Sequence, residues 1–258
     1  IFKQIDIFQF FSKVLALQFS GYALLKVMLL NTILFSVPLI EEYILVMGPE
    51  EFWNDLKAPF LALNPAQIWR GFSQDSLLSI RNIWFGPFVE ETIYRCALIN
   101  ILFFWPRRDR ITESFVFSSK GDELSFAFSR SGAIWLASLL FGVSHLHHMF
   151  QRYFHEGLPL NIVLIQSLVQ LVYTTVFGLY CGWVYVKTNN LWACYLLHAY
   201  CNWIGLPNFG RIFQNKKYSK QLVGGLIASV ILFFVCFPLF LKGDESNPFF
   251  SLKEVKIH

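Results

Sequence analysis

Long apolar runs recur from one end of this chain to the other, with no polar domain between them, and they limit what it can fold into. Of its 258 residues, 55% are hydrophobic and only 15% are charged, whereas a soluble globular domain carries about 25% charged residues. Lipid offers no hydrogen-bond partner to the backbone, so an isolated apolar segment that crosses a bilayer must be a helix. The sequence therefore predicts an all-α fold, a polytopic transmembrane helix bundle.

Runs of roughly 20 apolar residues, the length that spans a bilayer, divide the chain into six predicted spans. They are 22–40, 80–104, 133–150, 162–186, 191–206 and 223–241. We expect one integral-membrane domain over residues 1–258, with an amphipathic leader at 1–20 in the membrane interface. The polar segments 41–78 and 105–130 are expected to lie outside the bilayer.

Charge and cysteine content exclude several classes of protein. The net charge of +4 is mild and the basic residues are scattered, which excludes a nucleic-acid partner and leaves the lipid bilayer as the natural one. The five cysteines lie in apolar stretches without a C-x-x-C pair. This pattern indicates reduced, buried thiols and excludes a disulfide framework.

Ionisable residues inside apolar spans mark candidate functional sites, because their burial in lipid is costly. The second span contains Glu90, Glu91 and Arg95. Glu91 and Arg95 are four residues apart and can pair on one helix face, whereas Glu90 points about 100° away and lacks that partner. One of the two carboxylates is therefore a candidate general base. The alternative is a structural Glu–Arg clamp with a second carboxylate at a water-filled opening.

Histidines and an amide mark two further spans. His145 and His148 share a helix face and His147 is turned away, a cluster typical of proton carriers, metal ligands or interfacial residues. His198 and Asn202, at i and i+4, place two donors side by side, an arrangement that suits a developing oxyanion. An interhelical hydrogen bond is the alternative. Exceptions on three separate spans favour a catalytic site.

These motifs resemble those of a known family. Glu90-Glu91-x-x-x-Arg95, Phe141-x-x-x-His145 and His198-x-x-x-Asn202 look like the signatures of the CAAX-protease and bacteriocin-processing superfamily of intramembrane proteases. The surrounding residues are similar to the eukaryotic CAAX prenyl protease 2 branch, the Ras-converting type. The resemblance covers a catalytic core at about 80–207. Relatives have about eight spans, so amino-terminal spans are expected to be missing from this chain.

The resemblance implies an endoprotease of the endoplasmic reticulum membrane that removes the last three residues of prenylated Cys-a-a-X proteins. Its partners would be farnesylated or geranylgeranylated proteins such as Ras-like GTPases. Carried over by motif, Glu90 activates water with help from His145, and His198 with Asn202 forms the oxyanion hole. Glu91, Arg95 and His148 would support the site.

Three questions stay open on the sequence alone. Glu90, Glu91, His145 and His198 offer enough ligands for zinc; we nevertheless expect that no metal is required, because the chain lacks a His-Glu-x-x-His motif. A proton-coupled transporter or a non-catalytic scaffold is the rival from another class, although no inverted repeat is visible. A related protease that acts on unprenylated peptides is a third possibility.

Overall fold

The computed structural model describes residues 20–41, 54, 57, 60, 74–104, 107–108, 115–116, 129–205, 207, 209–215 and 217–241. The chain divides into two compact units. The first unit contains the described residues within 91–191, and the second contains those within 20–90 and 192–241. The predicted leader and most of the predicted polar segments lie outside the described residues.

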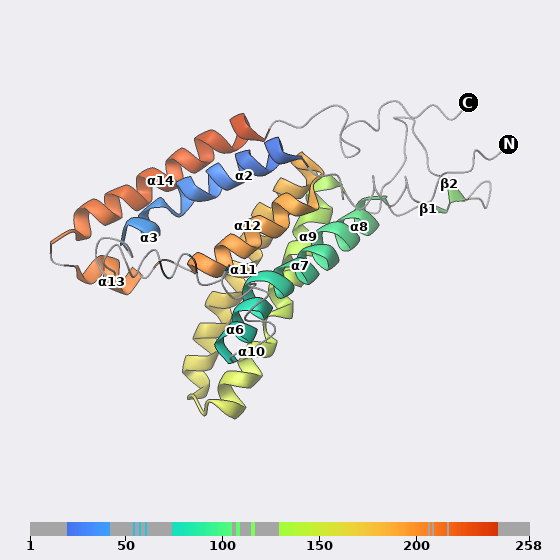
Figure 1. Ribbon diagram of the computed structural model, residues 1–258. Helices are drawn as coiled ribbons and strands as arrows, with labels where there is room; N and C mark the ends of the chain where they lie inside the picture. Colours follow the sequence, from blue (N-terminus) through green and yellow to red (C-terminus); the bar gives the residue numbers. More distant parts are fainter. Residues whose placement is uncertain are drawn as a thin grey trace. The chain divides into compact units, whose positions relative to one another are not determined.

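Helices account for nearly all of the described chain, as predicted (Figure 1). They are α2 (Gly21–Leu34), α3 (Ser36–Glu41), α6 (Gln74–Ser79), η2 (Ile80–Phe85), α7 (Gly86–Glu91), η3 (Thr92–Ile99), α8 (Asn100–Phe104), α9 (Arg130–Ser144), α10 (His147–Phe150), η4 (Gln151–His155), α11 (Leu160–Thr188), α12 (Leu191–Ile204), α13 (Phe209–Gln214) and α14 (Ser219–Phe240). The one departure from the all-α prediction is a short antiparallel pair, β1 (Arg107–Arg108) with β2 (Phe115–Val116).

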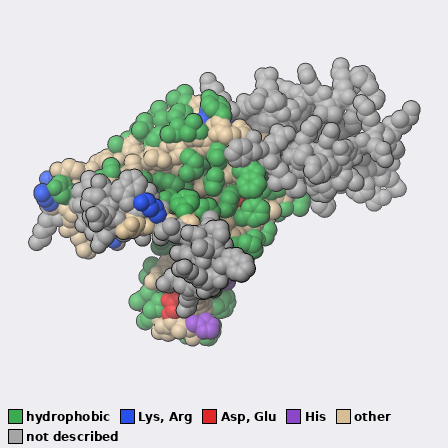
Figure 2. Space-filling model, in the orientation of Figure 1, with side chains coloured by type: hydrophobic (Ala, Val, Ile, Leu, Met, Phe, Trp, Pro, Cys, Tyr) green, Lys and Arg blue, Asp and Glu red, His purple; other side chains and the backbone are tan. Residues whose placement is uncertain are grey.

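Three of these helical segments are long and apolar enough to cross a membrane, namely Arg130–His155, Leu160–Thr188 and Ser219–Phe240. Each of the six predicted spans is mostly helical where it is described, with turns at Phe35 and at residues 145–146, and Gly21–Leu34 is a shorter apolar helix. Figure 2 shows hydrophobic side chains over much of the described surface. An exposed apolar surface of this kind is what lipid-facing helices present. The chain is a membrane protein, and the number of six spans stays a prediction.

Local residues explain where the long helices begin and end. Ser129 caps α9, because its hydroxyl accepts a hydrogen bond from the Gly132 N–H at 3.1 Å, and this interaction satisfies a helix-end donor. Pro159 precedes the first residue of α11. Asn189, with a φ of 46°, ends α11 in the left-handed conformation, which asparagine tolerates. These signals define the helical hairpin of the first unit.

Helices α9 and α11 pack closely in the first unit (Figure 1). A Cβ at Gly178 would lie only 3.0 Å from the Cβ of Ser138, and one at Gly182 would lie 2.9 Å from an Ile134 methyl carbon. Small residues allow helix backbones to approach in lipid, where van der Waals packing drives association. The hairpin therefore depends on these glycines.

In the second unit, α14 packs beside α2, and polar contacts join the other helices (Figure 1). The Asn31 amide of α2 donates to the Leu197 carbonyl of α12 at 3.4 Å. Arg211 of α13 pairs with the buried carboxylate of Glu41 in α3, with 3.4 Å between Nε and Oε1. Such contacts satisfy polar groups that would be costly in an apolar interior.

Residues 74–104 form one unbroken helical run whose turns vary in width. Segments η2 and η3 are π-helical, and α7 between them is α-helical. The Gly86 N–H donates to the carbonyl of Arg81, five residues back. Wide turns of this kind are frequent at functional sites. The run carries both acidic residues of the first motif, and the boundary between the two units falls between Glu90 and Glu91.

Candidate active site

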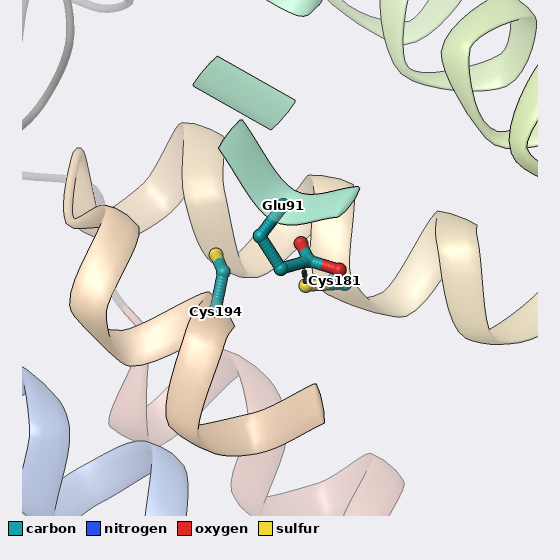
Figure 3. Close-up of side chains that lie close together, drawn as sticks. All are labelled: Glu91, Cys181 and Cys194. Carbon is teal, nitrogen blue, oxygen red and sulfur yellow. Dashed lines mark hydrogen bonds between the residues drawn. The ribbon is translucent and has the colours of Figure 1, made fainter. Parts of the chain in front are cut away.

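Glu91 lies in a closed polar cluster within the first unit. Its Oε2 lies 3.1 Å from Nε of Arg95, and neither side chain is more than 1% exposed. The Cys181 thiol of α11 donates to the same carboxylate oxygen at 3.0 Å (Figure 3). The Arg95 guanidinium also lies 4.3 Å from the centre of the Phe141 ring, within the range of a cation–π interaction. The cluster joins η3 to α9 and α11.

Glu90, the adjacent carboxylate, has a different environment in the second unit. Its side chain is 37% exposed, and its Oε2 lies 3.9 Å from Nε2 of His198, which is 6% exposed. This separation is too long for a direct hydrogen bond. One water molecule can bridge polar groups at such a distance. The pair thus combines an accessible carboxylate with a buried imidazole.

Asn202, one helical turn after His198, contacts the same helical run. Its side-chain amide donates to the backbone carbonyl of Asn82 at 2.8 Å. In a π-helix, that carbonyl would accept from the residue five positions later, but this residue is Pro87, which has no N–H. Gly86, four positions later, donates to Arg81 instead. The Asn202 amide therefore satisfies a carbonyl that proline leaves without its helical donor.

The bond to Asn82 also orients the Asn202 amide. A primary amide has two N–H donors, and only one of them is needed for the Asn82 carbonyl. The second donor remains for a ligand, and the first holds the amide plane in place. A donor held in this way needs little reorganisation when negative charge develops.

His145 belongs to the first unit, where α9 ends and the chain makes a turn. Its Nδ1 lies 2.8 Å from the carbonyl of Phe141. A carbonyl oxygen can only accept, so Nδ1 carries the proton in this contact and Nε2 of the neutral ring is left as an acceptor. A half-buried imidazole with a free basic nitrogen is suited to receive or hold a proton.

The other two histidines extend this region. The ring centres of His145 and His148 are 6.2 Å apart, so the two rings lie near each other as their spacing predicted. His147 does not follow the regular pattern, because its ring centre lies 4.0 Å from that of His148. The turn at residues 145–146 explains the difference, since the His148 N–H donates three residues back to His145 rather than four.

The structure thus assigns the predicted residues to two groups. Glu90, His198 and Asn202 lie in the second unit; Glu91, Arg95, His145 and His148 belong to the first. The proposed assistance of Glu90 by His145 stays a prediction, as does a zinc site with ligands from both units. Sequence reasoning missed Asn82, Pro87 and Cys181. A Gly86-Pro87 pair inside an apolar run was the available signal for the first two, because proline interrupts helical hydrogen bonding; Cys181 carried no signal.

A comparison with protein families shows one match. Residues 72–204 match the model of the family described as type II CAAX prenyl endopeptidase Rce1-like. This range contains every predicted site residue, from Glu90 to Asn202. No solved structure matches the chain.

Curated relatives point to the same group. The chain is 28% identical over 211 residues to a probable CAAX prenyl protease 2 of Schizosaccharomyces pombe. The aligned region covers 82% of this chain and 65% of that protein. It is 29% identical to CAAX prenyl protease 2 of Saccharomyces cerevisiae, over 63% of this chain and 46% of the relative. It is also 29% identical to CAAX prenyl protease 2 of Arabidopsis thaliana, over 73% of this chain and 53% of that relative. The chain spans about half to two thirds of the length of these relatives.

Proposed function

Because the chain belongs to the type II CAAX prenyl endopeptidase Rce1-like family, we propose that it is an intramembrane endoprotease. Its substrates would be proteins that end in Cys-a-a-X with a farnesylated or geranylgeranylated cysteine, such as Ras-like GTPases. It would remove the last three residues at the membrane of the endoplasmic reticulum. The lipidated cysteine would reach the site from the bilayer.

The observation that carries the proposal is the pair formed by Glu90 and His198. A hydrolytic base must be accessible to water, and 37% of the Glu90 side chain is exposed. Its neighbour His198 is buried, 3.9 Å away, so an attacking water molecule can lie within reach of both groups. Glu90 takes a proton from this water as the water attacks the scissile carbonyl. The same proton then passes to the departing amine.

The oxyanion that forms in this step would be stabilised by His198 and by the free N–H of Asn202. Donors held in place before the reaction contribute most when charge develops in the transition state. His145, with Nδ1 bound to the Phe141 carbonyl, would assist the activation of water through its Nε2. Glu91, Arg95 and His148 would support the helices that carry these groups.

We propose chemistry without a metal. A catalytic zinc ion takes three protein ligands and one water molecule. Within the described residues of the second unit, Glu90 and His198 are joined by no third His, Cys, Asp or Glu donor close enough to complete such a set. The proposal therefore uses only the carboxylate and the imidazole of this unit, and treatment with a chelator tests it against a zinc site.

Cleavage of a farnesylated Cys-a-a-X peptide by the purified protein in lipid vesicles tests the proposal. We expect release of the intact tripeptide, detected by mass spectrometry, with little effect of a strong chelator. Glu90→Gln should lower release by about 10²-fold or more. Glu156→Gln, which alters another exposed carboxylate, is the matched control and should leave release unchanged.

Absence of cleavage by folded wild-type protein would contradict the proposal and favour the scaffold or transporter. Loss of activity with chelator, restored by added zinc, would replace glutamate chemistry with metal chemistry. Equal cleavage of an unprenylated peptide would favour a protease that does not recognise the lipid.

A further inference from the structure

The guanidinium of Arg152 in the first unit is incompletely paired. Its Nη2 donates to the side-chain oxygen of Gln170 at 2.7 Å, and Gln170 is buried. Nη1 is also buried, and it has no hydrogen-bond partner among the described residues. Buried N–H groups are costly to leave without an acceptor. The geometry therefore indicates a missing acceptor beside Nη1.

This missing acceptor is expected to be an anion. Arginine stays positively charged under all ordinary conditions, and its one bonded partner, Gln170, is neutral. The acidic residue one turn further along, Glu156, contacts Gln151 instead, with 3.5 Å between Nε2 and Oε1. Arg152 forms no ion pair within the described part of the chain. A carboxylate is the partner that best matches the planar guanidinium.

The separation of Arg152 and His145 along the helical segment Arg130–His155 indicates which carboxylate is meant. His148 lies between them in the sequence, and its ring centre is 6.2 Å from that of His145. Seven residues at the α-helical rise of about 1.5 Å cover about 10 Å; this stretch contains a turn at residues 145–146 and enters a π-helix at Gln151. Three residues of extended peptide also span about 10 Å. A tripeptide beside this segment would reach from His145 to Arg152.

We propose that Arg152, oriented by Gln170, binds the C-terminal carboxylate of the peptide substrate and so sets the cut three residues from the chain end. The inference rests on the proposed function, in which His145 acts at the scissile bond. An enzyme that cuts at a fixed distance from a terminus needs a group that recognises that terminus. Arginine captures a carboxylate with two parallel hydrogen bonds, and a C-terminal amide lacks the required charge.

The test uses two farnesylated peptides that differ only at the terminus, a free carboxylate in one and a carboxamide in the other. Both are cleaved in vesicles of neutral lipid. Wild-type protein should prefer the carboxylate about tenfold or more in kcat/KM, since charged hydrogen bonds contribute that much. Arg152→Gln should remove this preference by raising KM for the carboxylate peptide, with kcat nearly unchanged. Arg130→Gln, which removes a basic residue at the opposite end of the Arg130–His155 segment, should retain the preference.

A second variant keeps the test valid if Arg152→Gln folds poorly. Gln170→Glu retains the acceptor beside Nη2 and supplies an internal carboxylate. It should weaken use of the carboxylate peptide by about tenfold and leave use of the amide peptide nearly unchanged. Arg152→Lys, which retains the charge but not the planar fork, should recover part of the preference.

Three outcomes would overturn the proposal. The first is equal cleavage of both peptides by wild-type protein, and the second is retention of the full preference by Arg152→Gln. An equal loss with both peptides that appears only when anionic lipid is present would assign Arg152 to lipid phosphate instead. If wild-type protein cleaves neither peptide, the proposed function fails, and competition binding of the two peptides to wild type and Arg152→Gln still decides the role of Arg152.

Discussion

Two neighbouring carboxylates have opposite environments in this protein. Glu91 is 0% exposed and is held by Arg95 and by the thiol of Cys181. Glu90, one residue earlier, is 37% exposed and lies 3.9 Å from a single buried imidazole. A helix directs successive side chains about 100° apart, so two adjacent residues can face different surroundings.

The difference separates a structural role from a chemical one. A buried ion pair with further hydrogen bonds resists change, because loss of either partner leaves an uncompensated charge. A half-exposed carboxylate with loose contacts can gain and lose a proton without disturbing the helices. We therefore propose that the cluster around Glu91 stabilises the fold and that Glu90 acts in hydrolysis.

Carboxamide substitutions at the two positions should affect different properties, turnover at Glu90 and stability at Glu91. Glu90→Gln should lower turnover by about 10²- to 10⁴-fold, the range for general-base catalysis, with an unchanged thermal midpoint in detergent. Glu91→Gln should lower the thermal midpoint instead. Parallel activity and thermal-unfolding measurements on both variants check this, and equal stability loss at both positions would contradict the division of roles.

Removal of Arg95 tests the structural half of the comparison. Arg95→Met should lower the free energy of unfolding by about 3–5 kcal/mol, because Glu91 would stay buried without its ion-pair partner. The double variant Glu91→Gln/Arg95→Met should lose less than the sum of the single losses. Denaturant titration in mixed micelles gives these values. Additive losses would mean that the pair has no mutual stabilisation.

The donors near Glu90 should show a smaller effect that is confined to turnover. His198→Ala and Asn202→Ala should each lower kcat by about 10²-fold or more, with little change in KM, because an oxyanion donor acts mainly in the transition state. Steady-state kinetics with the farnesylated peptide separates the two constants. A raised KM at constant kcat would instead assign these residues to substrate positioning.

The local sequence pattern was enough to predict the helices and the contact between Glu91 and Arg95. Apolar length predicted the helical spans, since lipid leaves the backbone few alternatives. The spacing of Glu91 and Arg95 predicted their pairing, which depends only on helix geometry. The short β1–β2 pair was not predicted, and it lies within the segment for which the sequence indicated only a polar connection.

Contacts between different helices could not be predicted from the spacing of residues in the sequence. Spacing placed His198 beside Asn202, and the family resemblance paired Glu90 with His145, but nothing in one sequence relates α7 to α12. The approach of His198 to Glu90 depends on helix packing. The contact of Asn202 with Asn82 depends on the π-helical turn as well, and the Gly86-Pro87 pair that signals an interruption there does not specify its partner.

The smallest predicted effect concerns the proline that separates Asn82 from its helical donor. Pro87→Ala restores an N–H five residues after Asn82, and this group competes with the Asn202 amide for the carbonyl. A neutral hydrogen bond contributes about 1 kcal/mol, so we expect turnover to fall about fivefold while stability holds or rises. Pro87→Ala combined with Asn202→Ala should be no slower than Asn202→Ala alone, because both changes act through one amide. Multiplicative losses in kcat would show that Pro87 acts on Glu90 by a separate route, through the shape of α7 itself.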